Sequence, residues 1–199
     1  MRIAAPLAAT AVAAFFLTAP AARAVDCPVA EGTDRFPLND EEVLALYDCI
    51  KDWMAESYAS EGDEIGATYR SWTVTATRPA VAGAHSERFL QTFANDIAAE
   101  QYLKFETEGV TMPVGSVLAK ESFGINAKTN MLRRGPLFIM TKVAAGEAPD
   151  TMGWVYSALQ PNGKPMTFKQ SFCHDCHAGW EDQDALAYPL EEVRVTPGN

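Results

Sequence analysis

Residues 112–143 read MPVGSVLAKESFGINAKTNMLRRGPLFIMTKV, and this stretch decides the class of fold. The turn-forming residues 112–115 lead into residues 116–122, which we predict to be a strand. A second apolar run follows Gly135-Pro136 and predicts another strand over 137–143. The stretch therefore contributes two strands to a predicted sheet.

The residues on either side extend this pattern. Alternating aromatic and β-branched residues predict a strand over 69–75, and further strands are expected over 87–93 and 154–159. Residues 79–83, which run from Pro79 to Gly83, are expected to break the strand that precedes them. Most of the predicted regular structure is thus extended.

Two helices complete the predicted elements. Residues 40–60 follow a capping Asn39 or Asp40, carry three acidic residues in the first turn and place apolar residues at helical spacing. A second helix is expected over 96–105. Because few helices separate the strands, we predict an α+β fold with an antiparallel sheet flanked by helices. No repeat or linker interrupts the chain, so residues 25–199 are expected to form one domain.

The C-terminal region holds the clearest chemical motif, Cys173-His174-Asp175-Cys176-His177. It matches the C-x-x-C-H pattern of covalent c-type haem attachment. Two thiols three positions apart can each add to a vinyl group of one porphyrin, and His177 then offers an imidazole as the proximal iron ligand. We therefore expect one haem c, bound through Cys173 and Cys176 near the C-terminus, with His177 as the metal ligand.

Three other interpretations of this motif compete. A thioredoxin-like C-x-x-C expects a strand–helix setting, whereas this motif follows a β-rich region. A zinc site would need four ligands within five residues, which cannot easily close a tetrahedron. A disulfide between the two cysteines would leave the adjacent histidine unexplained.

A sixth iron ligand is not singled out by the sequence. His174 occupies the variable position of the motif and is expected to be a surface histidine, and His85 lies in a Gly/Ala-rich stretch. Methionine is the sixth ligand of electron-carrying cytochromes c, but it also commonly fills cores. The methionine candidates are Met112, Met131, Met140, Met152 and Met166.

The N-terminus predicts export. Residues 1–24 combine Arg2, an apolar run from Ile3 to Leu17 and small residues ending in Ala22-Arg23-Ala24, which are the parts of a secretory signal. The apolar run is short for a membrane span, so we expect cleavage near Val25, a periplasmic location and no membrane span in the mature chain. An uncleaved anchor is the alternative.

Charge and cysteine content agree with that location. The chain has a net charge of −10, and removing Arg2 and Arg23 leaves 14 basic and 26 acidic residues, hence −12. This charge argues against a nucleic-acid partner and suits docking to a basic redox protein. In an oxidising compartment Cys27 and Cys49 are expected to form a disulfide worth roughly 3 kcal/mol; two free buried thiols are the alternative.

Several short segments occur in order along the chain: Tyr69-Arg70-x-Trp72, Phe93-Ala94-Asn95 with Ala98, Ala99 and Tyr102, residues 112–121, residues 135–142, and Gly153-Trp154-Val155-Tyr156 before the C-x-x-C-H motif. Together they resemble the cytochrome P-460 family, which includes the β-sheet cytochromes c-prime (the c-prime-beta type). The resemblance covers roughly residues 69–195.

The resemblance implies a haem-bearing antiparallel sheet, a homodimer and a five-coordinate iron that is open on its distal side. The P-460 enzymes oxidise hydroxylamine to nitrogen oxides, and one of their lysines bonds to the porphyrin edge; the matching residue here is Lys120. They also use a distal carboxylate and an arginine, for which Glu121 and Arg88 are available, an ordinary sheet or surface charge being the alternative for each. For Lys120 the alternative is a solvated charge or an ion pair.

Three functions follow for a periplasmic haem protein of this kind. The first is a hydroxylamine-oxidising oxidoreductase, which needs an open iron, a proton acceptor and a redox partner protein. The second is a nitric-oxide-binding protein with an apolar lid, for which Phe93, Phe123 and Phe138 are candidates, although strand aromatics commonly belong to the core. The third is an electron-transfer cytochrome with a sixth ligand.

Overall fold

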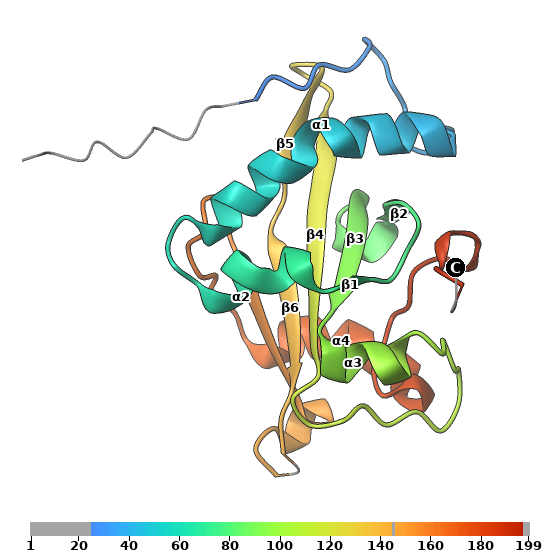
Figure 1. Ribbon diagram of the computed structural model, residues 1–199, viewed down its shortest axis with the longest axis vertical. Helices are drawn as coiled ribbons and strands as arrows, with labels where there is room; N and C mark the ends of the chain where they lie inside the picture. Colours follow the sequence, from blue (N-terminus) through green and yellow to red (C-terminus); the bar gives the residue numbers. More distant parts are fainter. Residues whose placement is uncertain (1–24, 145, 197–199) are drawn as a thin grey trace, which may run out of the picture.

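The computed structural model describes residues 25–144 and 146–196. Seven strands form one antiparallel sheet with the order β1-β3-β4-β6-β7, while β2 adds to β3 and β5 adds to β4 (Figure 1). The strands are β1 (Thr73–Val74), β2 (Ala80–Ala82), β3 (Arg88–Ala94), β4 (Val117–Asn126), β5 (Met131–Arg134), β6 (Leu137–Lys142) and β7 (Trp154–Leu159). The helices of the described residues are α1 (Asp40–Ala59), α2 (Glu64–Thr68), α3 (Asp96–Tyr102) and α4 (Gln170–His177), with short 3₁₀ turns between elements. The α+β prediction is confirmed.

The long strand β4 lies at the centre of the sheet and separates two cores. It pairs with β3 on one side and with β6 and β5 on the other. Because successive side chains of a strand point to opposite faces, Ala119 and Phe123 enter one apolar core and Leu118 enters the other. This alternation also sends the neighbours Lys120 and Glu121 to opposite faces of the sheet.

Helix α1 covers the first face. Its apolar residues Val43, Ile50 and Met54 pack against the β4 side chains of that face, and in Figure 1 the helix crosses in front of the strand. Asn39 caps the helix through the Glu42 backbone N–H at 3.0 Å, and the Glu42 side chain accepts from the Asn39 backbone in return. The helix starts and ends almost where the sequence predicts.

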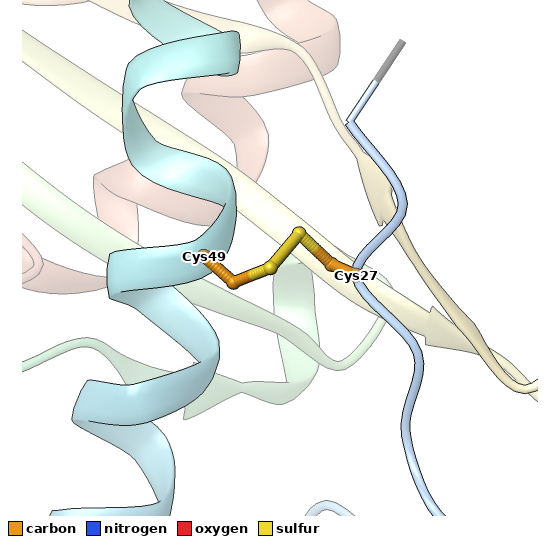
Figure 2. Close-up of a disulfide and its surroundings, with 2 residues drawn as sticks. All are labelled: Cys27 and Cys49. Atoms are coloured by element: carbon orange, nitrogen blue, oxygen red, sulfur yellow. A yellow bond between two sulfur atoms is a disulfide. The ribbon is translucent and has the colours of Figure 1, made fainter.

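A disulfide attaches the N-terminal segment to α1. Cys27 and Cys49 are joined in the structure (Figure 2), as the sequence predicts. The backbone carbonyl of Cys27 also accepts a hydrogen bond from Leu132 of β5 at 2.9 Å. The segment before α1 is therefore held both to the helix and to the sheet. The secretory signal predicted for residues 1–24 lies outside the described residues.

The second face carries α4 and the segments around it. Tyr102 of α3, Leu118 of β4 and Trp154 of β7 are buried in this second core, and Leu186 joins them from the segment that follows α4. In Figure 1, α4 lies behind the strands. Among the described residues, none of the helices is long and apolar enough to cross a membrane.

Two expectations for the first part of the sheet were wrong. Residues 69–75 contain a 3₁₀ turn at Tyr69–Ser71 and only the two-residue strand β1, because Tyr69 turns inward to donate a hydrogen bond to the buried Glu121 at 2.5 Å. Residues 79–83 do not simply break the sheet. They contain β2, whose three residues pair with β3.

The other strands agree closely with the prediction. β7 has the predicted bounds, whereas β4 runs four residues further than expected and α3 ends at Tyr102. The elements α2 and β5 were not predicted.

Candidate functional site

Helix α4 carries the C-x-x-C-H motif as its last turns. Cys173, Cys176 and His177 fall at positions i, i+3 and i+4 of a helix, which share one face. The side chain of Gln170 in the first turn binds the backbone of Tyr156 twice, accepting from its N–H at 2.7 Å and donating to its carbonyl at 2.9 Å. This pair of bonds docks α4 on the edge strand β7.

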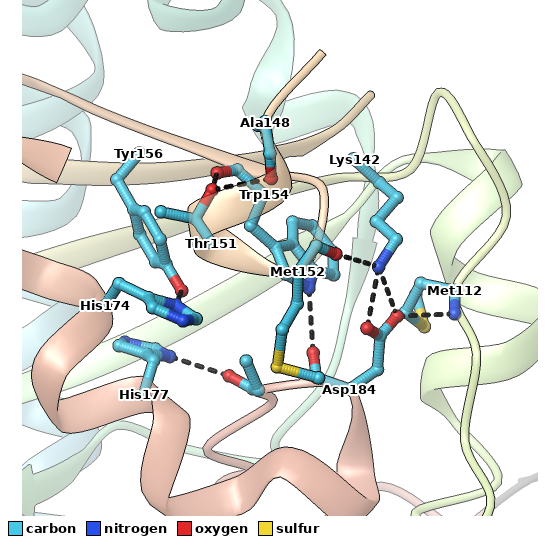
Figure 3. Close-up of polar contacts among 11 residues, drawn as sticks. Met112, Lys142, Ala148, Thr151, Met152, Trp154, Tyr156, His174, His177 and Asp184 are labelled. Carbon is cyan, nitrogen blue, oxygen red and sulfur yellow. Dashed lines mark hydrogen bonds and ion pairs between the residues drawn. The ribbon is translucent and has the colours of Figure 1, made fainter. Parts of the chain in front are cut away.

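The imidazole of His177 is oriented by a backbone carbonyl. Its Nδ1 donates to the Ala185 carbonyl at 2.8 Å (Figure 3), so Nε2 is the nitrogen left free to bind a metal. His177 is buried, and burial, together with the Lys120 charge, lowers its pKa to about 4. The ring is therefore neutral at pH 7, the form in which histidine binds metals.

A cavity of about 780 Å³ lies between α4 and the second face of the sheet. Cys173, Cys176 and His177 line one part of it. Strand residues that line it include Leu90, Thr92, Leu118, Lys120, Phe138, Ile139, Met140 and Tyr156. Most of these side chains are apolar, so the cavity suits a large flat hydrophobic group and falls within the usual size range of cofactor sites.

Lys120 lies on the sheet side of this cavity. It is paired in register with Thr92 of β3 and Phe138 of β6, near the middle of the sheet. Within the described part of the chain no charged or hydrogen-bonding group shifts its pKa, and burial alone lowers that pKa to about 8. A larger fraction of the amine is therefore deprotonated and nucleophilic than for an ordinary lysine.

His85 also lines the cavity, together with Arg88. The His85 ring packs on Phe138 with centroids 4.6 Å apart, and Arg88 donates to the His85 backbone carbonyl at 3.0 Å. Burial is the main cause that lowers the His85 pKa to about 3, with the charge of Lys120 next. The Gly/Ala-rich stretch gave no sequence signal for this placement, because it arises from the tight turn after β2.

Several candidate residues are not brought to the cavity. Glu121 faces α1 and is fully buried, where it accepts hydrogen bonds from Tyr47 at 2.6 Å, Tyr69 at 2.5 Å and Arg70 at 2.7 Å. It is therefore not a distal carboxylate, and its side chain pairs with Arg70 rather than with Arg88. Burial raises its pKa, an effect that Arg70 and the tyrosines oppose.

Some of the candidate lid residues and candidate axial ligands line the cavity, and others do not. Phe93 and Phe123 belong to the α1 core, and of the three candidate lid residues only Phe138 lines the cavity. Among the methionines Met140 and Met166 line it. His174 lies outside the cavity wall, with its Nδ1 3.1 Å from the Tyr156 hydroxyl.

The competing interpretations of the motif find little support. Within residues 25–144 and 146–196, no three His, Cys, Asp or Glu residues gather as a metal site. The thiols of Cys173 and Cys176 are not joined to each other, and burial raises the pKa of Cys173, whereas a redox thiol has a lowered one.

Comparison with known protein families matches residues 66–187 to cytochrome P460. The chain belongs to the cytochrome P460 family. The match begins in α2 and ends after the segment that contacts His177, so it includes the sheet, the cavity and the C-x-x-C-H motif. A search of curated proteins found no match.

Membership of the cytochrome P460 family implies a c-type haem protein, and the residues present fit that group. Both thiols and His177 lie on the cavity wall, and the Ala185 carbonyl leaves Nε2 of His177 free. The apolar cavity could hold a porphyrin, and Lys120 lies on the facing sheet. The four residues that the sequence and the family resemblance name as candidates, Cys173, Cys176, His177 and Lys120, all line the cavity, but the sequence gives no sign of the contacts made by Gln170 and Ala185.

Proposed function

We propose that the chain is a periplasmic mono-haem cytochrome in which Cys173 and Cys176 hold the haem covalently and His177 binds the iron through Nε2. The observation that carries this proposal is the orientation of His177. Its Nδ1 is occupied by the Ala185 carbonyl at 2.8 Å, and the ring is buried beside both thiols on the wall of one cavity.

The reaction that the site supports best is oxidation of hydroxylamine. Converting hydroxylamine to nitric oxide releases three protons and three electrons, so the site must remove both. The haem would supply an iron that binds the nitrogen atom and accepts electrons, which a redox partner protein would then carry away. The chain's own residues supply a largely apolar chamber, and His85, whose imidazole is neutral at pH 7, lies on its wall.

Lys120 supports the hydroxylamine-oxidising type in particular. The resemblance to the P-460 enzymes implies a bond from this lysine to the porphyrin edge, and an amine must be deprotonated to attack carbon. The pKa of Lys120 is lowered to about 8 by burial, as that chemistry requires. Its neighbours in register, Thr92 and Phe138, carry no charge that would compete for the amine.

Nitric oxide binding without oxidation is the second candidate. It is favoured by the apolar surface that Leu90, Leu118, Phe138 and Met140 contribute to the cavity. A neutral diatomic ligand needs only such a surface and an open iron position. The third candidate, electron transfer, needs a sixth ligand, and His85, Met140 and Met166 are the cavity residues of the right type.

The absorption spectrum of the ferrous protein separates the three candidates. A far-red-shifted Soret band is expected for a haem bonded to Lys120, an ordinary high-spin spectrum for a nitric oxide binder, and sharp low-spin bands for an electron carrier. The intact mass of the mature protein should exceed that of the polypeptide by one haem. Extraction of the haem by acid-acetone would refute covalent attachment.

The partners proposed for this function are a small nitrogen compound, a redox protein and a second copy of the chain. The acidic surface favours a basic redox partner, since the charge without residues 1–24 is −12 from 14 basic and 26 acidic residues. Sedimentation of the haem-loaded protein tests the homodimer directly.

A further inference from the structure

A buried ion pair lies next to the turn that orients His177. Lys142, at the end of β6, places its Nζ 2.6 Å from Oδ1 and 2.8 Å from Oδ2 of Asp184 (Figure 3). The same ammonium donates to the Met152 carbonyl at 2.7 Å. Both members of the pair are buried, and neither lines the cavity. The pair therefore acts on the site only through other residues.

Asp184 is held from three directions. Besides Lys142, its Oδ2 accepts from the Met112 backbone N–H at 2.7 Å, and its backbone carbonyl accepts from the indole N–H of Trp154 at 2.7 Å. These partners come from the loop before β4, from β6 and from β7. Position 184 is thus fixed relative to the sheet.

The turn at 184–185 has a backbone that needs such support. Asp184 has φ +55° and Ala185 has φ +61°, the left-handed region that residues with a Cβ adopt rarely, and alanine more rarely than aspartate. Such a turn persists only where its surroundings hold it. It points the Ala185 carbonyl at Nδ1 of His177, 2.8 Å away.

We propose that Lys142 and Asp184 are positioning residues that hold the 184–185 turn, and so set the hydrogen bond from His177 to the Ala185 carbonyl. This inference rests on the proposed function, in which His177 binds the haem iron. A carbonyl that accepts from Nδ1 raises the basicity of the other imidazole nitrogen and fixes the ring orientation. The ion pair of Lys142 and Asp184, here called the clamp, therefore strengthens His177 as a ligand and favours the ferric state of the haem iron.

The test uses the haem-loaded protein and two variants. Asp184→Asn removes the charge while keeping a residue that tolerates positive φ, and the double variant Lys142→Met/Asp184→Asn removes both charges without leaving one unpaired. The iron–histidine stretching band in the resonance Raman spectrum of the ferrous protein should move to lower frequency. The reduction potential should rise by the equivalent of roughly a tenfold shift toward ferrous, about 59 mV, with the larger change in the double variant.

Glu121→Gln is the matched control. It also removes the carboxylate charge of an ion pair, but on the opposite face of the sheet, where the buried Glu121 contacts the half-buried Arg70 and, from α1, Tyr47. It should lower the melting temperature without moving the stretching band. If the Asp184 variants lose stability to the same extent and leave the band and the potential unchanged, the clamp is merely structural and the inference is wrong.

Two further outcomes are informative. If the Asp184 variants fail to accumulate with haem, Trp154→Phe removes the indole hydrogen bond to the Asp184 carbonyl together with some core packing. It should shift the band in the same direction by a smaller amount, and no shift would overturn the inference. If the wild-type ferrous protein has no iron–histidine band, the proposed ligation by His177 fails first, and the two failures are distinguished.

Discussion

Lys120→Met should stabilise the protein when no haem is attached. The substitution keeps an unbranched side chain but removes the amine from the cavity. To keep the haem out, the comparison is made in a chain whose Cys173 and Cys176 are both alanine. In this background the wild-type lysine has to place a charge in a largely apolar cavity, and the methionine does not.

The size of the effect follows from the pKa of Lys120. Burial lowers this pKa from its ordinary 10.5 to about 8, a difference of about 2.5, and each pKa unit corresponds to about 1.4 kcal/mol. The full charge would therefore destabilise the folded chain by about 3.5 kcal/mol. Because the side chain is only half-buried and water can enter the cavity, we expect Lys120→Met to increase the free energy of unfolding by about 1–3 kcal/mol at pH 7.

The pH dependence gives the effect a signature. The unfolded chain binds more protons than the folded one between pH 8 and 10.5, so the stability of the wild type rises relative to the variant across that interval. The gain from Lys120→Met is therefore full below pH 8 and disappears above about pH 10.5. Urea unfolding followed by tryptophan fluorescence from pH 6 to 11 measures it, with the exposed Lys128→Met as the control.

A gain that is equal at pH 7 and pH 11 would refute this reasoning, since it would show a packing effect of methionine rather than the removal of a charge. If the background chain is only partly folded, the same argument predicts a larger folded fraction for Lys120→Met at pH 7 and no difference at pH 11. A loss of stability at pH 7 would show that the amine has a favourable partner.

His85→Ala should leave the ferrous spectrum high-spin, because the iron is proposed to be open on its distal side; a change from low-spin to high-spin bands would instead identify His85 as a sixth ligand. Replacing Cys27 and Cys49 with alanine should lower the free energy of unfolding by about 3 kcal/mol in urea titrations, because the disulfide closes a loop with a sequence separation of 22, and an unchanged midpoint would contradict this. Tyr69→Phe removes a donor 2.5 Å from the buried Glu121 and should lower the free energy of unfolding by about 1–3 kcal/mol while leaving the haem spectrum unchanged.

The elements with strong periodicity could be predicted from the sequence. The strand over 154–159 and the start of α1 at Asp40 were found because alternation and capping are local signals. The strand predicted over 69–75 was wrong because a partner distant in sequence sets the conformation of this segment. Tyr69 and Arg70 both bind Glu121, which is more than 50 residues away. No local pattern carries that information.

In the candidate site, too, local sequence patterns reveal some residues and not those that are placed by the rest of the fold. The C-x-x-C-H motif is a local pattern, so both thiols and His177 could be named directly from the sequence. The Gly/Ala-rich stretch around His85 gives no local sign of a site, because the place of His85 on the cavity wall depends on the turn that joins β2 to β3. The 184–185 turn could not be predicted either, because its left-handed residues are an aspartate and an alanine rather than glycines.

The contrast between Lys120 and Glu121 follows from one property of strands. The two residues are adjacent in β4, and both are charged and buried or half-buried, but alternation places them on opposite faces of the sheet. On the α1 face the carboxylate meets three donors, which satisfy it. On the cavity face the amine meets apolar side chains and no counter-charge among the described residues, so its pKa falls. The three donors on one face oppose the cost of burying the carboxylate, whereas the amine on the other face has no such partner among the described residues and lines the cavity. The residue that departs from ordinary core chemistry is thus the one that the proposed function requires.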